Sequence, residues 1–130
     1  MQPILGRFSG PAYALLRIVA GAMFACHGAQ KLFGAFGGPA MTDKPMMLAA
    51  GVIEFFGGAM IALGLAASYA AFVASGMMAV AYFMVHAPGG FWPIVNKGEL
   101  AVLYCFVFLY ISARGSGAWS LDDALLRKRG

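Results

Sequence analysis

Apolar residues fill four helix-length stretches of the chain, and short segments containing glycine, proline or polar residues separate them. The stretches lie at about residues 11–33, 45–65, 68–86 and 98–113. A run of about 20 apolar residues is long enough to cross the hydrocarbon core of a bilayer as a helix. We therefore predict an all-α fold, a four-helix transmembrane bundle that forms a single membrane domain over residues 1–130.

The last part of the chain has a different pattern. In GSGAWSLDDALLRKRG, short runs of charged residues are mixed with leucines, and Ser120 is followed three residues later by Asp123. A serine before an acidic residue at this spacing is a helix-capping signature. We predict a short amphipathic C-terminal helix that lies on the membrane surface.

The composition excludes an ordinary soluble domain. Hydrophobic residues make up 62% of the chain and charged residues only 11%, whereas soluble domains carry about a quarter charged residues. The net charge is +4, but the basic residues are not interleaved with aromatics as in single-stranded nucleic-acid sites. The expected partner is therefore the lipid bilayer, and no nucleic acid is expected.

The distribution of basic residues predicts the orientation. Four spans place both termini on one side, which then holds Arg7, Arg114 and the tail Arg127–Arg129, while the other side holds Lys31, Lys44 and Lys97. Cytoplasmic loops carry the excess of Lys and Arg. We predict a multi-pass protein of the plasma (inner) membrane with cytoplasmic N- and C-termini.

Several polar side chains fall within or beside the spans, where an uncompensated charge is costly. They are Arg17, His27, Lys31, Glu54, His86, Asn96 and Glu99. A helix advances about 100° per residue, so the first three share one side of the first span. The alternating direction of the spans brings polar residues from all four helices to the same depth. The sequence therefore predicts a polar cluster in the outer half of the bundle.

The role of this cluster has several open interpretations. Glu54 must be protonated or find a cation, and Arg17, His27 and Lys31 are the available ones. The cluster is then either an ion-pair network that fixes helix register or a pocket for a quinone head group, a small anion or a proton path. Contact with a partner subunit is a third interpretation.

More specific chemistries have weaker support. His27 and His86 are candidate ligands of a b-type haem, and with Glu54 and Glu99 they are candidate metal ligands, but they lack the tight spacing of metal sites. The chain has no nucleophilic triad, phosphate loop or nucleotide fingerprint. No catalytic residue and no metal site is therefore predicted.

The cysteines and tryptophans have plain structural interpretations. Cys26 and Cys105 fall inside apolar segments, and we interpret them as small buried hydrophobic residues, although sequence alone does not show whether they meet. Trp92 and Trp119 flank the spans and are interpreted as interfacial anchors.

Four motifs resemble, in order, those of the DoxX family of small bacterial membrane proteins. They are Arg17 with His27-Gly28 and KLFG at 31–34, GVIEFFGGAMIALGL at 51–65, Asn96 with Gly98–Ala101, and Trp119–Asp122. The resemblance covers nearly the whole chain and implies a four-helix membrane fold.

The resemblance also implies a class of function. Members of the family are described as a subunit of a thiosulfate:quinone oxidoreductase and as a membrane partner in oxidative-stress and thiol-handling complexes. We therefore expect a small, non-catalytic subunit or partner of a quinone- or thiol-linked redox complex, with no cofactor firmly assigned, quinone as the leading candidate, and a protein partner or homo-oligomer around it. A structural scaffold subunit and a small-solute carrier are the alternatives.

Overall fold

A computed structural model describes all 130 residues. The chain is helical throughout and has no strands, which confirms the all-α prediction. Three helical stretches are long and apolar enough to span a membrane, namely Gly6–Phe33, Pro45–Leu63 and Ala67–Gly89. They correspond to the first three predicted spans. The fourth corresponds to a shorter helix, α6 (Glu99–Arg114), of 16 residues.

The first helix pair is formed by the N-terminal half of the chain. Helix α1 (Ser9–Phe33) packs along a nearly continuous helix that consists of α2 (Pro45–Val52), the π-helical segment η3 (Ile53–Gly57) and α3 (Gly58–Leu63). The turn after α1 begins at Gly34, whose φ of 67° is a left-handed conformation that glycine adopts without strain.

The second helix pair is formed by the C-terminal half. Helix α4 (Ala67–Ala81) continues into a π-helical segment, η4 (Tyr82–His86), and packs extensively against α6. Between them, the chain passes through the 3-10 turn η5 (Ala87–Gly89) and the short helix α5 (Pro93–Asn96).

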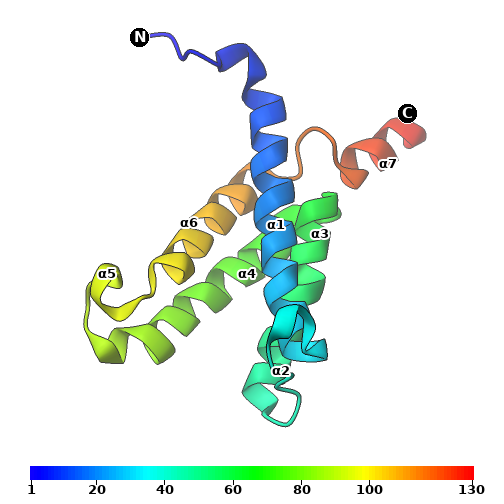
Figure 1. The fold of residues 1–130 in the computed structure, drawn as a ribbon. Coiled ribbons are helices and arrows are strands. Elements are labelled where there is room, and N and C mark those ends of the chain that lie inside the picture. Colours follow the sequence, from blue (N-terminus) through cyan, green and yellow to red (C-terminus); the bar gives the residue numbers. More distant parts are fainter.

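The two pairs meet at one end and separate at the other. Figure 1 shows α3 and α4 close together near the turn that joins them, while the α2 end of the first pair and the α5 end of the second lie far apart. An aromatic cluster fills the region where the pairs meet: the Phe24 ring centroid is 4.7 Å from that of Phe108, and Phe108 stacks on Tyr104 at 5.3 Å.

Glycines allow the helices of the first pair to touch along their backbones. A Cβ atom at Gly21 of α1 would lie 2.5 Å from the backbone nitrogen of Ala62, and Cβ atoms at Gly28 and Gly58 would meet backbone atoms as closely. Small residues at helical spacing are a common means of close packing in membrane bundles.

The C-terminal helix α7 (Leu121–Arg129) lies beside the end of the molecule where the two pairs meet (Figure 1). Its N-terminus is capped locally, because the Ser120 hydroxyl accepts a hydrogen bond from the Asp123 amide at 3.1 Å. A linker, residues 115–120, joins this helix to α6.

Candidate functional site

A polar cavity of about 250 Å³ lies between the two helix pairs, toward the end where they separate. Four of the predicted site residues line it, contributed by α1, η3 and η4: His27, Lys31, Glu54 and His86. The cavity is also lined by Lys97, which follows α5, and by Tyr104 of α6. Apolar side chains, among them Phe24, Met78 and Leu100, form the rest of the wall.

The centre of the cavity is a buried ion pair. The Lys31 ammonium donates hydrogen bonds to both carboxylate oxygens of Glu54, at 2.8 and 2.6 Å. The Glu54 side chain is only 5% exposed and that of Lys31 is 22% exposed. An isolated carboxylate at this depth would be strongly disfavoured, and Lys31 is the cation that pairs with it.

Both π-helical segments of the chain face this cavity. Glu54 lies in η3 and His86 in η4, and each segment interrupts an otherwise regular helix. Short π-helical segments within α-helices occur frequently at functional sites. One such segment therefore lies on each of two walls of the same cavity.

His86 is oriented by the segment that follows it. Its Nδ1 lies 3.2 Å from the backbone carbonyl of Asn96, and its ring stacks against Tyr82. Because a carbonyl can only accept a hydrogen bond, Nδ1 is the donor in this contact.

Asn96 stabilises the connection between η4 and α6 and does not line the cavity. Its side-chain nitrogen donates to the Gly90 carbonyl at 2.7 Å and to the Tyr82 hydroxyl at 3.1 Å, and its side-chain oxygen accepts from the Gly98 amide at 2.8 Å. The Tyr82 hydroxyl in turn donates to the Phe91 carbonyl. Asn96 therefore contributes to the site by positioning the backbone carbonyl that holds His86.

Tyr104 is a site residue that the sequence analysis missed. The residue is 6% exposed, its hydroxyl has no hydrogen-bond partner within the protein, and its ring lies edge-on to His27. A buried hydroxyl without a partner costs about 1–3 kcal/mol. Tyr104 is a lining residue of the cavity, so an unsatisfied donor lies in the cavity wall.

Glu99, predicted as part of the cluster, is exposed at the first turn of α6 and does not line the cavity. No ion pair connects it to a neighbour. An acidic side chain at this position interacts favourably with the N-terminal end of the helix dipole.

Arg17, predicted as part of the cluster, does not line the cavity and binds backbone carbonyls at the α7 end of the molecule. Its guanidinium is fully buried and donates four hydrogen bonds to backbone carbonyls: Nη1 to Ile61 at 2.8 Å and Ala62 at 2.7 Å, and Nη2 to Ala118 at 3.1 Å and Trp119 at 2.8 Å. Two of these carbonyls lie at the C-terminal end of α3, where the helix dipole favours a cation. Arg17 therefore joins the linker before α7 to the first helix pair.

The expectation that Arg17 helps to compensate Glu54 is wrong. Arg17 and Lys31 share one side of α1, but they are 14 positions apart, which is about 21 Å along a helix. Two residues on the same side of a helix can lie at different levels along its axis. Arg17 lies at the level of the linker before α7, away from Glu54.

Asp122 completes this attachment of the C-terminal segment. Its two carboxylate oxygens accept from the Ala66 amide at 3.0 and 2.9 Å, and one of them also accepts from the Ser116 hydroxyl at 2.5 Å. These hydrogen bonds, that from Ser116 above all, hold the pKa of Asp122 below its usual value. Ala66 has a φ of 48°, so Asp122 fixes a turn residue in a conformation that non-glycine residues rarely adopt.

The thiols and potential metal ligands are dispersed. Cys26 and Cys105 are both free; Cys26 is exposed on α1, contrary to the expectation of burial, and Cys105 is half-buried. No group of three or more His, Cys, Asp or Glu side chains is placed to hold a metal ion.

Comparison with known proteins places the chain in a family. The family model for DoxX matches residues 12–87. An uncharacterized protein of Haemophilus influenzae is 44% identical over 122 residues, which cover 88% of this chain and 91% of that protein. No solved structure matches the chain. With its apolar helices and this similarity, the chain is a small integral membrane protein that belongs to the DoxX family.

Proposed function

We propose that this protein is a small membrane subunit of a quinone-linked redox complex and that its polar cavity binds the quinone head group. The observation that carries the proposal is the buried, unpartnered hydroxyl of Tyr104, a residue that lines the same cavity as the Lys31–Glu54 ion pair. A hydroxyl donor and an ammonium donor beside apolar walls suit a flat ring that bears carbonyl oxygens.

Each polar group has a part in this proposal. Tyr104 and Lys31 donate hydrogen bonds to a quinone carbonyl, while the Nε2 of His86 accepts from a quinol hydroxyl. Glu54 exchanges a proton with the bound ring when Lys31 shifts its hydrogen bonds from the carboxylate to the ligand. Electrons come from a redox group on a partner subunit, so this chain binds the quinone and exchanges protons with it but carries no electrons itself.

A purely structural role is the second candidate, and one observation favours it. Both oxygens of Glu54 are bonded to one ammonium, Lys31, as in an ion pair that fixes helix register. In that case the cavity would have no ligand, and the chain would act as a scaffold subunit.

Binding of ubiquinone-1 to the purified protein in detergent tests the proposal, with affinity measured by calorimetry. Tyr104→Phe removes the hydroxyl and should weaken binding about tenfold, which corresponds to about 1.4 kcal/mol. The same variant should unfold at an unchanged or slightly higher temperature, because this hydroxyl has no partner in the protein.

Tyr69→Phe is the matched control, because Tyr69 is 80% exposed on α4, far from the cavity lining. It should bind ubiquinone-1 like the unaltered protein. If Tyr104→Phe and Glu54→Gln both bind ubiquinone-1 with unchanged affinity, the quinone proposal is wrong and the scaffold role gains support.

We further propose that α6 is the fourth span and that the α7 end of the molecule faces the cytoplasm from the inner membrane. The charge distribution supports this orientation. The α7 end holds six basic and two acidic residues, namely Arg7, Arg17, Arg114, Arg127, Lys128, Arg129, Asp122 and Asp123. The other end holds three basic and three acidic residues, namely Lys31, Lys44, Lys97, Asp43, Glu54 and Glu99. The positive-inside rule counts Lys and Arg and assigns their excess to the cytoplasmic side, so six basic residues against three favour the α7 end as the cytoplasmic face.

A fusion of green fluorescent protein after Gly130 tests the orientation. This reporter fluoresces only when it folds in the cytoplasm, so the fusion should be bright, and an alkaline phosphatase fusion at the same point should be inactive. The opposite pair of results would reverse the proposed orientation.

A further inference from the structure

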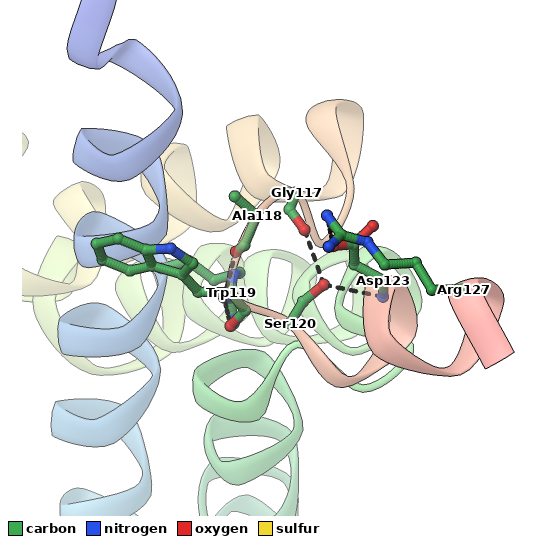
Figure 2. A network of polar contacts seen from close by, with 7 residues as sticks. Gly117, Ala118, Trp119, Ser120, Asp123 and Arg127 are labelled. Atoms are coloured by element: carbon green, nitrogen blue, oxygen red, sulfur yellow. Dashed lines mark hydrogen bonds and ion pairs between the residues drawn. The ribbon is translucent and has the colours of Figure 1, made fainter.

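A second cavity lies at the α7 end of the molecule, remote from the polar site. This open cavity, of about 980 Å³, is bounded on one side by the N-terminal half of α1 and the C-terminal end of α3 and on the other by the linker and α7. Its walls include Ile18, Ala62, Leu63, Trp119, Ala124 and Arg127. Figure 2 shows the linker residues with Trp119 and Arg127 pointing to opposite sides of them.

We propose that this cavity binds the head group of an anionic phospholipid of the surrounding bilayer. The argument begins with charge. All of the net positive charge of the protein is at this end, and the cavity is lined by one basic residue, Arg127, and one acidic residue, Asp123. An anionic group is therefore the ligand that the surrounding field favours.

Arg127 can bind a phosphate at little cost. It lies 3.0 Å from Asp123, but its side chain is 80% exposed, and exposed ion pairs of this kind contribute little stability. A guanidinium matches the geometry of a phosphate with two parallel hydrogen bonds. Arg127 therefore exchanges a weak surface partner for a stronger one when the phosphate binds.

The apolar part of the cavity favours a lipid over a free anion. Ala62 and Leu63 lie at the C-terminal end of α3, Ile18 lies in the N-terminal half of α1, and Leu63 is 56% exposed. Trp119 is 60% exposed on the opposite wall, as is usual for tryptophans at the membrane–water interface. A phospholipid brings its phosphate and its glycerol and upper acyl carbons together, so it matches both kinds of surface.

The cavity wall is held in place before any ligand binds. Arg17 fixes the carbonyls of Ala118 and Trp119 from within the bundle. The Ser120 hydroxyl donates to the Gly117 carbonyl at 2.7 Å and accepts from the Asp123 amide, and both contacts are drawn in Figure 2. A preorganised wall lowers the ordering cost of binding.

Native mass spectrometry of the full chain in detergent, titrated with phosphatidylglycerol or phosphatidylcholine, tests the proposal. We expect tighter binding of phosphatidylglycerol and a loss of about tenfold in Arg127→Gln. The matched control is Lys128→Gln, which removes the same charge from the same helix at a residue that does not line the cavity. It should lose less than twofold.

A second variant fills the cavity without changing charge. Ala124→Trp should lower phosphatidylglycerol affinity about as much as Arg127→Gln while the unfolding temperature stays within a few degrees of that of the unaltered protein. Equal losses in Arg127→Gln and Lys128→Gln, equal binding of the two lipids, or displacement of the lipid by millimolar inorganic phosphate would each overturn the assignment.

Discussion

The Lys31 ammonium of α1 contacts both carboxylate oxygens of Glu54 in η3, at 2.8 and 2.6 Å, inside a cavity between the two helix pairs. Lys31→Met would leave Glu54 as a buried charge without a partner. The loss of one member of a buried pair costs about 3–5 kcal/mol. We expect this loss in the free energy of unfolding, measured by denaturation in detergent.

The double variant Lys31→Met/Glu54→Met controls for the chemistry of the pair. Replacement of both partners by apolar side chains of similar size is often neutral, so the double variant should recover most of the stability that Lys31→Met loses. If the double variant is as unstable as the single one, packing around the pair, and not the uncompensated carboxylate, is the cause.

Arg17→Lys tests the attachment of the linker. A lysine cannot reach four carbonyls in two directions, so at least two of the carbonyls at Ile61, Ala62, Ala118 and Trp119 lose their donor. Hydrogen bonds to charged groups contribute about 1.5–3 kcal/mol each, and we expect the variant to lose about 3 kcal/mol. Trp119 fluorescence in a Trp92→Phe background should shift to longer wavelength as the linker detaches; an unchanged spectrum would contradict this account.

The attachment through Asp122 should depend on pH. The pKa of this carboxyl is lowered in the folded protein by Ser116 and the Ala66 amide. The folded state then holds fewer protons than the unfolded state as the pH falls below about 4, so the stability that Asp122 contributes is present above that pH and is lost as the pH falls through the lowered pKa. The unfolding temperatures of the unaltered protein and of Asp122→Asn should therefore converge between pH 5 and about pH 2. A difference that stays constant over this range would assign the stability to other groups.

Close backbone packing makes Gly28 sensitive to substitution. A Cβ atom there would meet the backbone of Phe55 in η3, next to Glu54. Overpacking of this kind costs about 1–3 kcal/mol, and we expect Gly28→Ala to lower the unfolding temperature. Gly76→Ala is the control, because nothing lies within 4 Å of a Cβ at this position of α4; it should stabilise the helix by about 0.5–1 kcal/mol.

Features that depend on neighbouring residues could be predicted from the sequence. The apolar stretches gave the helices, and the Ser120–Asp123 spacing gave the cap of α7. The sequence also named Lys31 among three candidate cations for Glu54, because alternating spans bring them to one depth.

Features that depend on distant contacts could not be predicted. Tyr104 lies on the apolar face of α6 that also carries Ala101 and Phe108, so its pattern is that of a core residue. Arg17 shares the face of Lys31 but binds at another level, and the partner of Asp122 is a turn amide 56 positions away. Only the packing of helices against each other determines these contacts.

The Arg17 site has a consequence for sequence divergence. Every atom that its guanidinium binds belongs to the main chain, and every amino acid provides the same carbonyl. The residues at 61, 62, 118 and 119 are therefore free to change in related proteins as far as this contact is concerned, provided that the path of the polypeptide is preserved. The contact requires only Arg17 itself and the backbone path at the end of α3 and in the linker. Relatives with little sequence identity in the linker would therefore still keep this attachment.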